Sequence, residues 1–200
     1  MMRFIRLASV AAVVLAASIA SANAANLIEN GGFEKPAAPA GGLKRLSVGA
    51  KIAPWKIVGA GGTVDLISTE FSQGGYDFIA KSGDQFLDLT GDSNSPIGVE
   101  QVITTKRGKL YSVTLFVGSV YNPGGIFGTQ SAVRVLVDGE EIATFVQTAK
   151  AGPSVQQWRK FSTEFTATKT KTRVTLLNAD ASNDTDNGVD KVSVEEVPEP

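Results

Sequence analysis

The sequence has 200 residues with 19 basic and 20 acidic side chains, and this balance leaves no basic surface for a nucleic acid partner. It contains no histidine and no cysteine, which excludes disulfides, most zinc sites and the usual catalytic bases and nucleophiles. The length is sufficient for one hydrophobic core, so we expect a single domain.

Residues 1–24 have the pattern of a secretory signal peptide. Arg3 and Arg6 precede an apolar run that ends at Ile19, and Ala22-Asn23-Ala24 supplies a small-residue cleavage site before Ala25. The run is shorter than the roughly 20 apolar residues that cross a bilayer, which favours cleavage over a membrane anchor. We therefore expect an exported protein, periplasmic or extracellular, with no membrane span in its mature form.

Residues 25–196 are predicted to form one all-β domain. Apolar and polar side chains alternate in many short segments, and the mature sequence has no apolar repeat of helical period. Asp138-Gly139 separates two such segments, which favours a type I′ hairpin. A first strand is expected before Asn30, and others at 55–58, 63–68, 85–89, 97–104, 112–117, 132–137, 140–148, 159–166, 172–178 and 189–196. Such a series, separated by turn-rich segments, indicates an antiparallel sandwich of two sheets.

Two acidic residues near the ends of the domain are candidate ligands for calcium, which binds oxygen atoms. Glu34 follows the predicted first strand in the segment NGGFE, and Asp190 lies in the predicted last strand. The first and last strands of a sandwich are often neighbours, so one ion could bind both ends of the domain. The alternative is that Glu34 forms an ion pair with Lys191 or caps a turn.

Aromatic and amide side chains in loops are candidates for contact with a sugar, because sugars stack on exposed rings and hydrogen bond to amides. The loop at 121–128, YNPGGIFG, ranks first since its glycines allow a ligand to approach the backbone closely. The predicted ligand-binding residues are Tyr121, Asn122, Phe127, Trp55 and Tyr76. For Trp55, a position in the core is the alternative.

Catalysis in this chain would have to depend on carboxylates. A glycosidase needs two acidic groups across a sugar bond, roughly 5 to 10 Å apart. Solvated charges on strand faces are the alternative, and we expect no enzymatic activity. The candidate carboxylates, which the sequence alone does not pair, are Asp65, Asp84, Asp88, Glu100 and Glu164.

Six segments taken in order resemble a known group of exported proteins. They are ANLIENGGFE, PWKIVGAGGTVDLIS, GDQFLDLTGD, IGVEQVITTKRGKLYSVTLFVG, WRKFSTEFTATKTKTRVTLLN and DNGVDKVSVEEVPEP. This set resembles the choice-of-anchor C family of bacterial exported proteins and the plant cell-wall proteins of the domain of unknown function 642 (DUF642) family. The resemblance implies a galactose-binding-like jelly roll, a structural calcium at Glu34 and Asp190, and a polysaccharide or cell-wall glycan as partner.

The last four residues, 197–200, read VPEP. In similar proteins this motif opens a PEP-CTERM sorting signal that continues into an apolar span and is processed by an exosortase. We interpret it here as the remnant of such a signal, with an exosortase as partner only of a chain with a longer tail.

Together these patterns predict an exported, non-catalytic carbohydrate-binding module stabilised by calcium. One alternative is a structural matrix protein that associates with itself and has no defined ligand. Another is a glycoside hydrolase that uses a pair of carboxylates such as Asp65 and Asp88.

Overall fold

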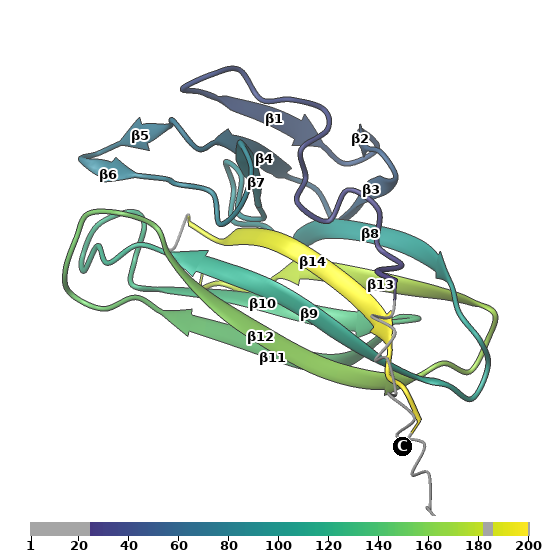
Figure 1. Cartoon of the computed structure of the whole chain (residues 1–200). Coiled ribbons are helices and arrows are strands. Elements are labelled where there is room, and N and C mark those ends of the chain that lie inside the picture. Colours follow the sequence, from purple (N-terminus) through teal and green to yellow (C-terminus); the bar gives the residue numbers. More distant parts are fainter. Residues whose placement is uncertain (1–24, 182–185, 200) are drawn as a thin grey trace, which may run out of the picture.

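The computed structural model describes residues 25–181 and 186–199, and these form two stacked six-stranded antiparallel sheets (Figure 1). The predicted signal peptide, the middle of the acidic loop at 180–186 and Pro200 lie outside the described residues. In Figure 1 one layer contains β9, β12 and β14, and the strands β10, β11 and β13 lie behind it. The predicted all-β jelly-roll sandwich is confirmed.

We call the two layers the front sheet and the back sheet. The front sheet contains, in spatial order, β1 (Leu43–Ser47), β4 (Thr63–Ser68), β7 (Gln85–Asp88), β14 (Gly188–Glu196), β9 (Leu110–Ser119) and β12 (Gln157–Thr166). The back sheet contains β11 (Glu140–Thr148), β10 (Gln130–Val137), β13 (Lys171–Asn178), β8 (Ile97–Thr104), β3 (Trp55–Gly59) and β2 (Lys51–Ile52). A separate hairpin joins β5 (Ser72–Gln73) to β6 (Tyr76–Asp77).

The main core lies between the two sheets, because alternate side chains of each strand point inward. Leu66, Leu87 and Val117 from the front sheet pack with Val135 and Leu176 from the back sheet, and all five are fully buried. This burial of apolar surface stabilises a fold that has no disulfide.

The strand pattern in the sequence predicted most of these elements. Strands β4 and β8 have the predicted bounds, and both Asp138 and Gly139 have positive φ, at 52° and 95°, as a type I′ turn requires. The strand expected before Asn30 is wrong. That segment is extended, but its backbone bond to the sheet is from the Leu27 N–H to the Val194 carbonyl, 2.8 Å, so it joins β14 without forming a strand.

A second, smaller hydrophobic cluster lies on the outer side of the front sheet. Its buried members are Ile67, Phe78, Phe86, Val120 and Phe127. The segment that carries β5 and β6 covers it, and Phe78 packs against Phe127 with ring centroids 5.1 Å apart. The outer face of the front sheet is therefore partly covered, which creates room for a pocket there.

The described residues include no helix long and apolar enough to cross a membrane.

Candidate functional site

A row of paired residues crosses the outer face of the front sheet. Arg45 on β1 pairs with Asp65 on β4, and Asp65 pairs with Asp88 on β7. Asp88 pairs in turn with Gly188 on β14. Residues directly opposite each other in an antiparallel ladder point to the same face, with Cβ atoms about 5 Å apart. The row therefore brings one guanidinium and two carboxyl groups together from three strands.

The first two members of this row form a bidentate ion pair. Arg45 donates from Nε to Asp65 Oδ1 at 3.0 Å and from Nη2 to Oδ2 at 2.8 Å. The side chain of Asp65 is 3% exposed, whereas that of Arg45 is 45% exposed and also reaches Asp92 at 3.6 Å. Both oxygens of Asp65 are thus bound, and the hydrogen bond to Asp65 raises the pKa of Arg45.

The third member, Asp88, has no cationic partner among the described residues. Its Oδ1 accepts hydrogen bonds from the N–H and Oγ1 of Thr90, at 2.9 and 2.7 Å, and from the Asn187 N–H at 3.2 Å. Its Oδ2 accepts none within 25–181 and 186–199, although the residue is only 4% exposed. Burial raises the pKa of Asp88 to about 7, and the charge of Asp65 adds to this effect.

These groups border a pocket of about 180 Å³, which we call the acidic pocket. Its polar lining consists of Arg45, Asp65, Asp88, Asp186 and Gln73. Its apolar walls are supplied by Leu43, Ile67, Phe71, Phe78, Ile126 and Phe127. Asp186 accepts a hydrogen bond from the Val120 N–H at 2.8 Å. The pocket thus combines a charged, hydrogen-bonding floor with aromatic and aliphatic walls.

The loop at 121–128 holds its own shape by hydrogen bonds between its side chains and backbone. Asn122 accepts from the Phe127 N–H at 3.2 Å and donates to the Tyr76 hydroxyl at 3.1 Å, and that hydroxyl donates to the Tyr121 carbonyl at 2.9 Å. Phe127 is 6% exposed and packs against Phe78. The predicted binding residues Tyr76, Asn122 and Phe127 are brought together, but they build the loop, and they offer no exposed ring face.

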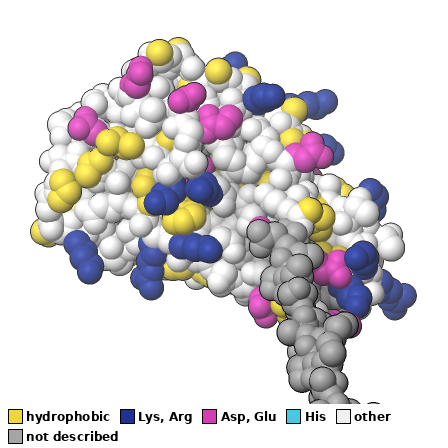
Figure 2. Space-filling view, in the orientation of Figure 1, with side chains coloured by type: hydrophobic (Ala, Val, Ile, Leu, Met, Phe, Trp, Pro, Cys, Tyr) yellow, Lys and Arg dark blue, Asp and Glu magenta, His cyan; other side chains and the backbone are white. Residues whose placement is uncertain are grey.

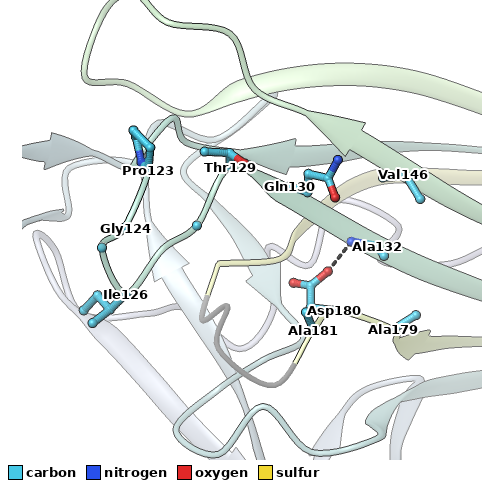
Figure 3. Close-up of a pocket in the computed structure, with 12 residues that line it drawn as sticks. Pro123, Gly124, Ile126, Thr129, Gln130, Ala132, Val146, Ala179, Asp180 and Ala181 are labelled. Atoms are coloured by element: carbon cyan, nitrogen blue, oxygen red, sulfur yellow. Dashed lines mark hydrogen bonds between the residues drawn. The ribbon is translucent and has the colours of Figure 1, made fainter.

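On the other side of this loop lies an open groove of about 930 Å³, the loop groove (Figure 3). Figure 3 shows Pro123, Gly124 and Ile126 on one side, and Gln130 and Val146 on the neighbouring strands. The opposite side is formed by Ala179, Asp180 and Ala181, with Asp180 bound to the Ala132 N–H. Ile126, which is 59% exposed, lines both the groove and the acidic pocket.

The structure places Glu34 and Asp190 side by side, as predicted. Both carboxylates accept hydrogen bonds from one loop, Asp190 from the Ser82 N–H at 3.0 Å and Glu34 from the Asp84 N–H at 3.2 Å. Burial raises the pKa of Asp190 to about 7, and the charge of Glu34 raises it further. No ion pair joins Glu34 to Lys191 in the described parts of the chain.

Whether this pair fits calcium depends on its donor set. The two carboxylates have backbone N–H groups as hydrogen-bond partners and no basic side chain in the described residues, so a cation would relieve their repulsion. However, no group of three or more acidic, histidine or cysteine residues that could hold a metal occurs within the described residues. An ion here would need carbonyl oxygens or water to complete its coordination.

Basic side chains lie close to this pair. Figure 2 shows Lys and Arg side chains gathered beside hydrophobic ones over the face formed by β9, β12 and β14. Lys81 lies over the Phe116 ring, 5.0 Å from its centroid, and Lys160 and Lys191 line the same cavity as Glu34. The charge of this face is therefore mixed.

Of the two remaining predicted residues, Trp55 lies in the core and Tyr121 begins the loop at 121–128. Trp55 is fully buried, packs against Phe33 with centroids 5.5 Å apart, and donates from Nε1 to the Asn30 carbonyl at 3.1 Å. The ligand role expected for Trp55 is therefore corrected to a core role. Tyr121 is half-buried, and its carbonyl anchors Tyr76.

Sequence reasoning named Asp65 and Asp88 as possible catalytic carboxylates but missed Arg45, because β1 itself was not predicted. The segment LKRLS of β1 alternates only weakly. The pairing of Arg45 with Asp65 depends on the register between β1 and β4, which the sequence does not show.

The chain is similar to several solved structures, of which the first described here has a TM-score above 0.5 and agrees with the fold. A cyclase from Fischerella sp. TAU in complex with 4-(1H-indol-3-yl)butan-2-one is 18% identical, with a TM-score of 0.56 over 86% of this chain and 96% of its own. A family 35 carbohydrate binding module from Clostridium thermocellum is 14% identical, with a TM-score of 0.46 over 76% of this chain and 97% of its own. The C-terminal domain of EclA, described as a sugar-binding protein, is 18% identical, with a TM-score of 0.38 over 48% of this chain, and the chain spans 64% of its length.

At these identities the likenesses concern the fold alone. A search of curated proteins finds no match. The family model described as "Protein of unknown function (DUF642)" matches residues 26–195, which include both carboxylate pairs and all of the sandwich except Glu196. The chain belongs to the DUF642 family.

Proposed function

We propose that this protein binds carbohydrate without altering it chemically, and that the acidic pocket and the loop groove are the binding site. The observation that carries this proposal is the lining of the acidic pocket. Arg45, Asp65 and Asp88 can hydrogen bond to hydroxyl groups, while Phe71 and Ile126 offer apolar surface to the C–H face of a sugar ring.

The size of the two hollows favours a polymer as ligand. The acidic pocket is smaller than the roughly 300 to 1,000 Å³ that accommodates a drug-sized ligand, so it suits one sugar ring or one side group. The loop groove is about 930 Å³ and open. Because Ile126 lines both, a chain lying in the groove can place one unit over Ile126 into the pocket.

Binding to glycan arrays and mobility in polysaccharide-containing gels test this proposal. Ile126→Ala removes an exposed side chain at the shared border and should weaken binding roughly fivefold or more by loss of buried apolar surface. Val102→Ala is the matched control, since Val102 is also exposed, at 53%, but lies on β8 of the back sheet. Failure to bind any neutral or charged glycan, or equal loss in both variants, would contradict the proposal.

Hydrolysis is a second candidate, because Asp65 and Asp88 share one pocket and burial raises the pKa of Asp88 to about 7. The geometry still favours binding. Both oxygens of Asp65 are held by Arg45, and the two carboxyl groups stand side by side on one sheet face instead of across a cleft. Release of new reducing ends from a bound glycan, abolished by Asp88→Asn, would establish hydrolysis and refute the non-catalytic assignment.

Calcium between Glu34 and Asp190 is part of the proposal. Supporting it are the closeness of the two carboxylates, their lack of a basic partner in the described segments, and the raised pKa of Asp190. When bound, the ion would neutralise both groups and link the start of the domain to its last strand. Equilibrium dialysis with calcium, with Asp190→Asn as the comparison, tests this.

Export completes the proposal. Its support is the signal-peptide pattern of residues 1–24. N-terminal sequencing of the protein recovered from outside the cytoplasm should begin at Ala25, and an uncleaved N-terminus would contradict the prediction.

A further inference from the structure

The charges that line the acidic pocket do not balance. Among the described lining residues one cation, Arg45, faces three carboxyl groups, those of Asp65, Asp88 and Asp186. Arg45 is already bound to Asp65 through both oxygens, and it also contacts Asp92 outside the pocket. Asp88 therefore has no ion pair with the one cation that lines the pocket.

One of the two carboxylate oxygens of Asp88 accepts no hydrogen bond from the described residues. The residue is 4% exposed and lines the pocket, and its Oδ1 is held by Thr90 and Asn187. Its Oδ2 has no hydrogen-bond partner in the described chain and remains accessible from the pocket. This oxygen is therefore available to accept a hydrogen bond from a group that enters the pocket.

We propose that the acidic pocket recognises a positively charged amino group of the glycan, such as the ammonium of a de-acetylated amino sugar, held against Asp88 Oδ2. This inference rests on the proposed carbohydrate binding and adds the chemical class of the ligand. An ammonium supplies both a hydrogen-bond donor and the missing positive charge, whereas a neutral hydroxyl supplies only the donor.

The walls of the pocket fit the same ligand. Phe71, Phe78 and Phe127 all line it. Phe78 and Phe127 are buried, but Phe71 is only half-buried, and an aromatic ring attracts a cation within about 6 Å of its centroid. A divalent metal is a poorer occupant, because both oxygens of Asp65 are already bound to Arg45 and the apolar walls offer no oxygen ligands. A compact organic cation with apolar carbon atoms fits both the acidic groups and the apolar walls of the pocket.

Protonation of Asp88 should compete with this ligand. The groups that face Asp88 are Asp65 on β4, Arg45 on β1 and Asp186 before β14, and burial raises the pKa of Asp88 to about 7. Half of the Asp88 groups are then ionised at pH 7 and about a tenth at pH 6, so affinity for an ammonium should fall about fivefold over that unit. Binding of a neutral sugar should change less.

Calorimetric titration with β-1,4-linked glucosamine oligomers and their N-acetylated counterparts of equal length tests the inference at pH 7. We expect the amino oligomers to bind at least about tenfold more tightly, and Asp88→Asn to remove that difference. Glu140→Gln, which removes one exposed charge on β11, is the matched control and should leave it intact. This control separates specific recognition from general attraction to an acidic protein.

The possible results separate the two proposals. Equal affinity for both oligomers, or an Asp88→Asn protein that retains the preference, overturns the amino-group inference and leaves carbohydrate binding standing. No binding of any glycan overturns both. A lysine-containing peptide that binds more tightly than the amino oligomers, with the same sensitivity to Asp88→Asn, would instead identify a protein partner and refute the inference.

Discussion

Replacing Asp88 with asparagine should stabilise the protein at alkaline pH. Burial raises the pKa of this carboxyl from its ordinary 3.8 to about 7. Between these two values the folded protein keeps a proton that the unfolded chain releases. The protonated carboxyl therefore contributes its full share of stability below the unfolded pKa of 3.8, and this share is lost as the pH rises through about 7. About three pKa units at 1.36 kcal/mol each make the ionised group cost about 4 kcal/mol at pH 8.

Asparagine keeps the shape of the side chain and carries no charge. Its carbonyl oxygen can accept the bonds that Oδ1 of Asp88 receives from Thr90 and Asn187, with a loss of about 1 kcal/mol because a neutral acceptor is weaker. We therefore expect Asp88→Asn to be about 2 to 3 kcal/mol more stable than the wild type at pH 8. That corresponds to a rise in Tm of about 4 to 12 °C for a domain of this size.

Denaturant unfolding followed by tryptophan fluorescence at pH 4 and pH 8 measures the effect. The advantage of Asp88→Asn should disappear at pH 4, where the carboxyl is protonated in the folded protein and nearly half protonated in the unfolded chain, so its burial costs less than about 1 kcal/mol. Asp65→Asn is a contrasting variant, because Asp65 is paired with Arg45, and it should lower stability by about 1 to 3 kcal/mol at pH 8. If Asp88→Asn were less stable than the wild type at pH 8, or if its advantage were equal at both pH values, the electrostatic reasoning would be refuted.

Three further predictions concern the rest of the molecule. Calcium at about 100 times its Kd should stabilise the protein by about 2.7 kcal/mol, and a thermal melt of Asp190→Asn should show no such shift; an equal shift in the variant would place the ion elsewhere. Trp55→Ala should cost about 3 to 5 kcal/mol in denaturant unfolding and leave glycan affinity unchanged, because Trp55 is fully buried in the core. Gly83→Ala should abolish the stabilisation by calcium, because the added Cβ would lie 2.0 Å from Glu34 Oε1. Gly75 is the control, since it has a similar positive φ but no atom within 4 Å of an added Cβ, and Gly75→Ala should keep the stabilisation in the same melt.

The fold could be predicted from sequence because its determinants are local. Alternation along β4 and β8 and the Asp138-Gly139 turn each depend on a few consecutive residues. Strand β1 escaped prediction because its burial is only partial and alternates weakly, as expected of an edge strand. The short β5 and β6 were not among the predicted strands, because they are stabilised by packing on Phe78 and Phe127, which the local sequence does not show.

The candidate site could be predicted only in part, for the opposite reason. Asp65 and Asp88 lie in recognisable strands, but their pairing with each other and with Arg45 depends on the register between β1, β4 and β7. The loop at 121–128 was expected to contact a sugar, and it borders both the acidic pocket and the loop groove, but Asn122 and Phe127 build the loop itself. Whether an aromatic ring faces a ligand or the core depends on packing that one sequence does not show.

The proposed role of Asp88 links stability and binding in one residue. Nothing in the packing of the front sheet requires a carboxylate directly opposite Asp65, since like charges in that position weaken a sheet. Residues that reduce stability in this way are common at functional sites, where the lost stability is recovered as binding energy. The same substitution, Asp88→Asn, should therefore raise stability at pH 8 and weaken the binding of an amino glycan. Should the variant gain stability and also keep its affinity, the buried charge would need a different explanation.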